Sequence, residues 1–109
     1  MNQKFLIVAN IKAEVESLVK ILKVLGFQNV IDPKKEMIDV AFIDYFLVDG
    51  SDSLEIIKSL KEINSDVRLV IMSYYDIATV AKANGAGFLQ KPFSLESVRQ
   101  ALLDSIKIK

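Results

Sequence analysis

The chain has 109 residues with 14 basic and 14 acidic side chains, and it contains no cysteine and no histidine. The length suits one domain covering residues 1–109. The balanced charge gives no support for binding to nucleic acid or to an anionic membrane. The missing residue types exclude disulfides, thiol chemistry, histidine-based acid–base catalysis and the usual zinc sites. The short apolar segment after Met1 is too short for a signal peptide, so we expect a cytoplasmic protein.

The first half of the chain alternates short apolar runs with segments of helical period. Residues 5–9 are uniformly apolar and predict a strand, and residues 13–25 predict a helix that ends at Gly26. Residues 27–31 are less uniformly apolar and predict a second strand at an edge of the sheet. Only one helical turn, over residues 33–37, fits before the next strand begins, although a parallel crossover normally takes a dozen residues or more.

The second half continues the alternation. Residues 38–44 and 68–73 predict strands, with a helix between them over residues 53–63. A short helix over residues 77–84 follows Asp76. The inner face of the 53–63 helix is predicted to comprise Leu54, Ile57, Leu60 and Ile63.

The chain ends in a strand over residues 87–90, a turn at residues 91–93 and a helix capped by Ser94. The apolar stripe of that last helix is Leu95, Val98, Leu102 and Ile106. Strands that alternate with helices predict a parallel α/β sheet covered by helices on both faces.

Polar residues end three of the apolar strands: Asp44, Ser73 and, just after the last strand, Lys91. The carboxyl ends of such strands meet at one edge of the sheet, where open α/β sheets bind their ligands. A carboxylate, a hydroxyl and an ammonium group there could handle a phosphoryl group. Alternatively, Ser73 is only a turn residue and Lys91 only pairs with Asp44.

This order of residues resembles the receiver domain of bacterial two-component response regulators. The most specific match is the stretch Gly85-Ala86-Gly87-Phe88-Leu89-Gln90-Lys91-Pro92-Phe93, and the runs ending in Asp44 and Ser73 resemble two further family strands. The resemblance implies a flavodoxin-like, CheY-like doubly wound sheet of five parallel strands in the order 2-1-3-4-5. It also implies that Asp44 is the phosphoacceptor position, that Ser73 and Lys91 contact the phosphate, and that Phe88 is the switch aromatic. Lys91-Pro92 is then a cis peptide bond.

The family has two acids after its first strand, and here those positions are Ala9 and Asn10. The remaining candidate ligands for Mg²⁺ are Asp44, Asn10 and the backbone carbonyl of Phe46. Mg²⁺ relies on carboxylates, so we expect weak binding at best and impaired phosphoryl transfer. Without the two acids, Lys91 is freer to pair directly with Asp44.

Large side chains around the site are a second departure from the family pattern. We expect Phe46 and Leu47 to fold into the core, and the sequence leaves open whether Tyr45, Tyr74 and Tyr75 are exposed. An exposed tyrosine cluster suits protein recognition, because tyrosine combines apolar area with a polar tip.

Missing helical material is a third departure. The second helix is reduced to about one turn, and the helix over residues 77–84 is about one turn shorter than in the family. This reduction would uncover part of one sheet face, which we expect a partner or a second copy, forming a homodimer, to cover.

The leading hypothesis is a degenerate, stand-alone pseudo-receiver. It would be a protein-interaction module in phosphorelay signalling rather than an enzyme, and its partner would be a histidine kinase or a downstream target. The alternative is an active receiver phosphorylated on Asp44 by a histidine kinase. A nucleotide-binding domain is disfavoured, because residues 9–13 contain no glycine that would let the backbone cradle a phosphate.

Overall fold

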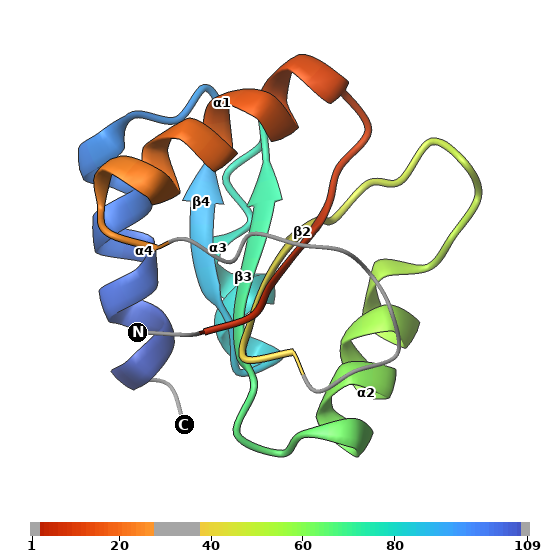
Figure 1. Cartoon of the computed structure of the whole chain (residues 1–109). Helices are drawn as coiled ribbons and strands as arrows, with labels where there is room; N and C mark the ends of the chain where they lie inside the picture. The colour runs from red at the N-terminus through yellow and green to blue at the C-terminus, as the bar shows by residue number, and fades with distance from the viewer. Residues whose placement is uncertain (1–2, 28–37, 108–109) are drawn as a thin grey trace.

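The computed structural model describes residues 3–27 and 38–107, which contain a parallel sheet (Figure 1). Each strand pairs with the next one along the chain, in the order β1-β2-β3-β4. The strands are β1 (Phe5–Val8), β2 (Val40–Asp44), β3 (Arg68–Ser73) and β4 (Gly87–Gln90).

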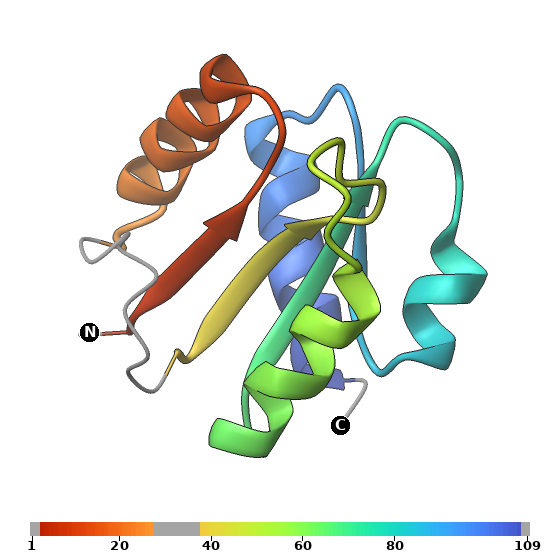
Figure 2. The same ribbon diagram turned by 90° about the vertical axis from the view of Figure 1, so that its right-hand side faces the viewer.

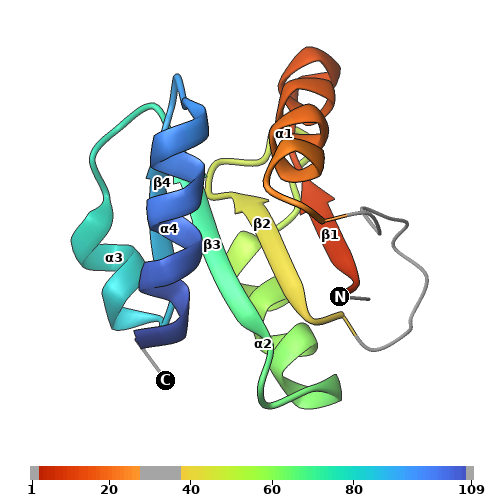
Figure 3. The same ribbon diagram turned by 60° about the vertical axis from the view of Figure 1, so that its left-hand side comes forward.

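Helices cover both faces of this sheet, which gives the domain three layers (Figure 2). The helices α1 (Lys12–Val24) and α4 (Leu95–Lys107) lie on one face, in front of the strands in Figure 3. The helices α2 (Ser53–Ile63) and α3 (Ala78–Ala83) lie on the other face.

The middle of each strand is apolar because successive side chains enter two different cores. Phe42 and Val70 belong to the core beneath α1 and α4, whereas Ile43 and Ile71 belong to the core beneath α2 and α3. All four side chains are fully buried. A strand with only one buried face would instead alternate apolar and polar residues.

The predicted α/β architecture with a parallel sheet is confirmed. The order of the four described strands corresponds to the 1-3-4-5 part of the predicted order. The predicted strand over residues 27–31 and the helical turn over 33–37 lie, apart from Phe27, outside the described residues. None of the described helices is both long and apolar enough to cross a membrane.

The boundaries and caps of the helices follow the sequence closely. Gly26 has a φ of +99°, as expected for the left-handed residue that ends α1. The Ser94 hydroxyl accepts a hydrogen bond from the Ser97 N–H at 3.1 Å and caps α4. Lys91-Pro92 is a cis peptide bond, as predicted.

The predicted apolar stripes were too long. Ile57 and Val98 in the middle of their helices are buried, but the predicted core residues at the helix ends are exposed: Leu54, Ile63, Leu95 and Ile106. A short sheet covers only the central turns of a helix that packs across it, so the end residues extend past its edge.

Candidate functional site

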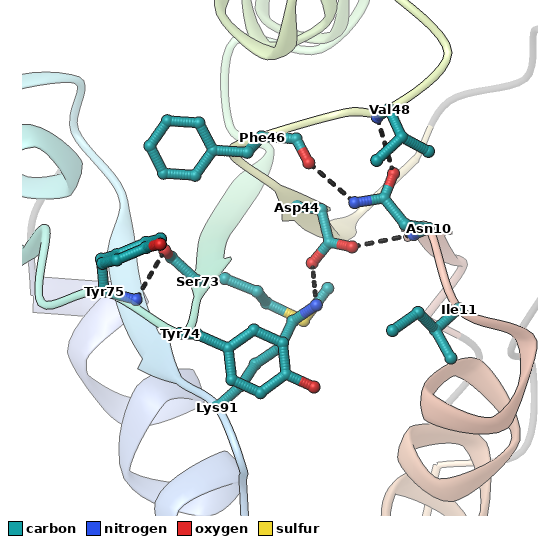
Figure 4. Close-up of a pocket in the computed structure, with 10 residues that line it drawn as sticks. Asn10, Ile11, Asp44, Phe46, Val48, Ser73, Tyr74, Tyr75 and Lys91 are labelled. Carbon is teal, nitrogen blue, oxygen red and sulfur yellow. Dashed lines mark hydrogen bonds and ion pairs between the residues drawn. The ribbon is translucent and has the colours of Figure 1, made fainter.

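The three predicted site residues come together at the carboxyl edge of the sheet (Figure 4). The β2–β3 register places Asp44 beside Met72, and the β3–β4 register places Ser73 beside Gln90, directly before Lys91. Asp44, Ser73 and Lys91 are 2%, 4% and 6% exposed, and all three line one pocket of about 220 Å³. These three side chains form the polar floor of a pocket that opens to solvent.

Asp44 and Lys91 form a direct ion pair, with 2.6 Å between Lys91 Nζ and Asp44 Oδ1. The backbone N–H of Lys91 donates a hydrogen bond to the Ser73 carbonyl at 2.8 Å, which holds the Lys91 backbone next to the end of β3. Burial alone would lower the pKa of Lys91, but the hydrogen bonds to Asp44 and Glu14 outweigh it and raise the pKa. Lys91 is therefore a firmly held cation.

Ser73 lines the same pocket, but its hydroxyl is turned toward the following loop. Its Oγ accepts a hydrogen bond from the backbone N–H of Tyr75 at 3.0 Å. The hydroxyl thus stabilises the β3–α3 loop in this state, at the mouth of the pocket.

Asn10 joins the end of β1 to the loop after β2 on the other side of Asp44. Its backbone N–H donates to Asp44 Oδ2 at 2.8 Å. Its side-chain amide donates to the Phe46 carbonyl at 2.7 Å, and its amide oxygen accepts from the Val48 N–H at 3.0 Å. One neutral side chain thereby closes the loop over the site (Figure 4).

These contacts engage the oxygens that the sequence suggested as ligands for Mg²⁺. Asn10 Oδ1 and the Phe46 carbonyl each accept a hydrogen bond, and Asp44 binds Lys91 and the Asn10 backbone. Within residues 3–27 and 38–107 there is no group of three or more acidic, histidine or cysteine side chains that could hold a metal ion. The arrangement does not fit Mg²⁺, which prefers several carboxylate or water oxygens in octahedral geometry.

Glu14 is a site residue that the sequence analysis missed. It extends from the first turn of α1, and its Oε1 lies 2.7 Å from Lys91 Nζ. Its Oε2 accepts a hydrogen bond from the Tyr74 hydroxyl, and the Tyr74 ring centre lies 5.1 Å from Lys91 Nζ. An acid in the first helical turn usually only complements the helix dipole, so the residue type of Glu14 did not point to the site. The signal in the sequence was the position of Glu14, four residues after Asn10.

The charges around Lys91 shift the pKa values of its neighbours. Burial alone would raise the pKa of Glu14, but hydrogen bonds from Lys91 and Tyr74 outweigh it and lower the pKa. The hydrogen bond to Glu14 raises the pKa of Tyr74. At neutral pH Glu14 is therefore a carboxylate, Lys91 an ammonium group and Tyr74 a neutral phenol.

Two other predicted positions lie away from the pocket floor. Ala9 is partly buried and packs against the core beneath α1 and α4. Phe88 is partly buried and packs against the core beneath α2 and α3.

An exposed apolar rim surrounds the polar floor. It comprises Ile11, Phe46, Val48, Tyr74 and Tyr75. Phe46, Val48 and Tyr75 are 55%, 84% and 71% exposed, and the Phe46 and Tyr75 rings meet edge to face at 5.9 Å.

The composition of the rim overturns one expectation of the sequence analysis, for Phe46, and answers a question that the sequence left open, for Tyr45. The expectation that Phe46 enters the core was wrong. The Phe46 carbonyl accepts a hydrogen bond from the Asn10 side chain, and the Phe46 side chain is exposed to solvent. Tyr45 is half-buried against the core beneath α2 and α3 and leaves the exposed positions to Tyr74 and Tyr75.

Comparisons with known proteins give a consistent result for the fold. No family model matches the chain. A 79-residue alignment, covering 69% of the chain, is 32% identical to sporulation initiation phosphotransferase F of Bacillus subtilis (strain 168). The alignment spans 63% of that relative, which is less than two thirds of its length.

Solved structures extend the likeness to almost the whole chain. A response regulator from Thermotoga maritima has a TM-score of 0.74 at 20% identity, covering 98% of this chain and 99% of its own. A response regulator from Burkholderia pseudomallei, solved with a phosphorylated aspartic acid and a calcium ion, has a TM-score of 0.75 at 21% identity. That match covers 98% of this chain and 71% of the other.

Proposed function

Because this chain has the receiver-domain fold of response regulators, we propose that it is a protein-interaction module in phosphorelay signalling, with Mg²⁺-dependent phosphorylation of Asp44 lost or weak. The single observation that carries the proposal is the Asn10 side chain, which bonds to both Phe46 and Val48. In this role a neutral amide replaces an ion as the link between the β1 end and the β2 loop.

The charge around Asp44 supports the same proposal. Asp44 and Glu14 surround the single ammonium group of Lys91, so this group of three carries one net negative charge. Phosphoryl donors are anions, and their transfer depends on cations that neutralise charge developing in the transition state. This net negative charge of the group around Lys91, with no fitting metal site beside it, opposes that reaction.

The interaction surface is the apolar rim of Ile11, Phe46, Val48, Tyr74 and Tyr75. Exposed aromatic side chains around a pocket are typical anchors of protein interfaces. A histidine kinase, a downstream target or a second copy of the chain are the partners that this surface would serve. Light scattering over a dilution series distinguishes the last of these, because a homodimer dissociates on dilution and a monomer does not change.

The second candidate function is that of an active receiver phosphorylated on Asp44 by a histidine kinase. It is favoured by the convergence of Asp44, Ser73 and Lys91 in one pocket. This arrangement has the carboxylate, hydroxyl and ammonium groups that phosphoryl transfer requires, and lacks only a fitting cation site.

Intact-mass measurement after incubation with acetyl phosphate and Mg²⁺ separates the two candidates. We expect no phosphoryl adduct on the natural chain. A clear adduct that disappears in Asp44→Asn would overturn the proposal.

A gain-of-function variant is the matched control for that experiment. Asn10→Asp places a second carboxylate next to Asp44, and we expect calorimetry to detect Mg²⁺ binding to this variant but not to the natural chain. Equal Mg²⁺ binding by both proteins would show that the Asn10 contacts do not exclude the ion.

A further inference from the structure

Lys91 is enclosed by side chains from two segments that are distant in sequence. Glu14 comes from α1, and Tyr74 comes from the loop after β3. Glu14 bridges Lys91 and Tyr74, because one of its carboxylate oxygens contacts Lys91 Nζ and the other accepts a hydrogen bond from the Tyr74 hydroxyl. We refer to Glu14, Tyr74 and Lys91 together as the Glu14 latch.

We propose that the Glu14 latch is an autoinhibitory gate in which Glu14 positions Lys91 and Tyr74 so that the ammonium group is withheld from any incoming anion. Among the described residues that line the pocket, Lys91 is the one cation that could otherwise bind an anion. In the latched state it faces Asp44 at 2.6 Å, Glu14 at 2.7 Å and the Tyr74 ring at 5.1 Å. Each of these neighbours is negatively charged or presents the negative face of a ring.

Tyr74 is also the wall between two hollows. It lines the pocket above Asp44, and it lines a second hollow formed with Ala13, Ser17 and Phe93. Its side chain is half-exposed and packs over Lys91 rather than into the core. If the Tyr74 side chain turns away from Glu14, the two hollows join and the side of Lys91 that the ring covers becomes accessible.

The latch thereby connects the rim to the pocket floor, a consequence that rests on the proposed interaction function. Tyr74 belongs to both, so a partner that binds the outward face of its ring and moves it must break the hydrogen bond to Glu14. By thermodynamic reciprocity, a change at Lys91 that favours the open state also favours that partner.

Lysine labelling tests the latch without a metal ion or a phosphodonor. The protein is treated with a limiting pulse of an acetylating reagent, and modification of Lys91 is measured by peptide mass spectrometry against exposed Lys20 as the internal reference. We expect Lys91 to react several-fold faster in Glu14→Gln, because the variant removes the carboxylate that lies 2.7 Å from Lys91 Nζ and helps to raise the pKa of the lysine. In Tyr74→Ala the rate should rise by a similar factor as the covering ring is lost.

Two further variants assign the effect to its cause. Tyr74→Phe keeps the ring but removes the hydroxyl, so it should react faster than the natural chain and more slowly than Tyr74→Ala. Tyr75→Ala removes an exposed ring that contacts Phe46 instead, so its Lys91 rate should be unchanged.

The result that overturns the latch is an unchanged, slow Lys91 rate in both Glu14→Gln and Tyr74→Ala, with native circular dichroism and thermal midpoints. Equal acceleration in Tyr75→Ala would also overturn it, because general loosening of the loops would then explain the data. The latch stands or fails separately from the proposed function, which is tested with acetyl phosphate and Mg²⁺.

Discussion

The two sides of Asp44 are built from different chemistry. On the Oδ2 side, the Asn10 backbone and amide form neutral hydrogen bonds that link Asp44, Phe46 and Val48. On the Oδ1 side, Lys91 and Glu14 form a chain of charges covered by Tyr74. A divalent cation at such a site would do two jobs, bridging loops and neutralising carboxylates.

In this chain those two jobs are divided between two side chains. Asn10 supplies the bridge and Lys91 supplies the neutralising charge. If the proposed function holds, this edge keeps its local architecture without an ion because the Asn10 backbone and Lys91 contact the two Asp44 oxygens. The division also predicts that the two sides respond differently to substitution, because leaving a buried charge without its counter-ion costs more free energy than losing a neutral hydrogen bond.

Breaking the charged side should have the largest effect. Lys91→Met leaves Asp44, only 2% exposed, without its cation, and we expect a loss of about 3 kcal/mol in the free energy of unfolding. Urea unfolding followed by circular dichroism measures it. Adding Asp44→Asn to Lys91→Met should recover part of the loss, since the orphaned charge is then removed.

Lys20→Met is the control for removing a lysine, because Lys20 is exposed on α1. Its cost should stay within about 0.5 kcal/mol. If Lys91→Met costs no more than Lys20→Met, the ion pair does not stabilise the edge.

Breaking the neutral side should cost less and act locally. Asn10→Ala removes two hydrogen bonds at the protein surface, so we expect a loss of about 1–2 kcal/mol. The more specific readout is hydrogen exchange at the Val48 N–H, which should lose its protection.

Asn10→Asp distinguishes the two hydrogen bonds of the Asn10 side chain. A carboxylate still accepts a hydrogen bond from the Val48 N–H but cannot donate one to the Phe46 carbonyl. Protection at Val48 should therefore survive in Asn10→Asp. If Asn10→Ala leaves that amide protected, another group closes the loop.

The same contrast explains what the sequence could predict. Uniformly apolar strands ending in polar residues were sufficient to place Asp44, Ser73 and Lys91 at one edge, because strand direction and sheet topology determine where strand ends meet. The absence of acids at Ala9 and Asn10 indicated that Lys91 is freer to pair with Asp44, and the two form an ion pair.

The partners of those residues were less predictable. Glu14 lies in the first turn of a helix, where an acid is common, and only the packing of α1 brings it to Lys91. Phe46 looked like a core residue by composition. Its outward direction follows from the loop conformation that Asn10 stabilises, which no local pattern encodes.

The smallest expected effect concerns the pH dependence of the charged side. Because contacts with Lys91 and Tyr74 lower the pKa of Glu14 below 4.5, its contribution to stability is present above that pH. The contribution is lost as the pH falls through the lowered pKa of the folded state, where the carboxylate takes up a proton.

Thermal unfolding of the natural chain and Glu14→Gln across the acid range measures this effect. The natural chain should be the more stable protein above pH 4.5, and the difference should shrink as the solution becomes more acidic. Glu16→Gln, at an exposed position of the same helix, makes the same charge change away from Lys91 and isolates the part specific to Glu14. A Glu14→Gln difference that stays constant through the acid range would mean that Glu14 and Lys91 are not coupled in solution, and the charged side of Asp44 would then consist of Lys91 alone.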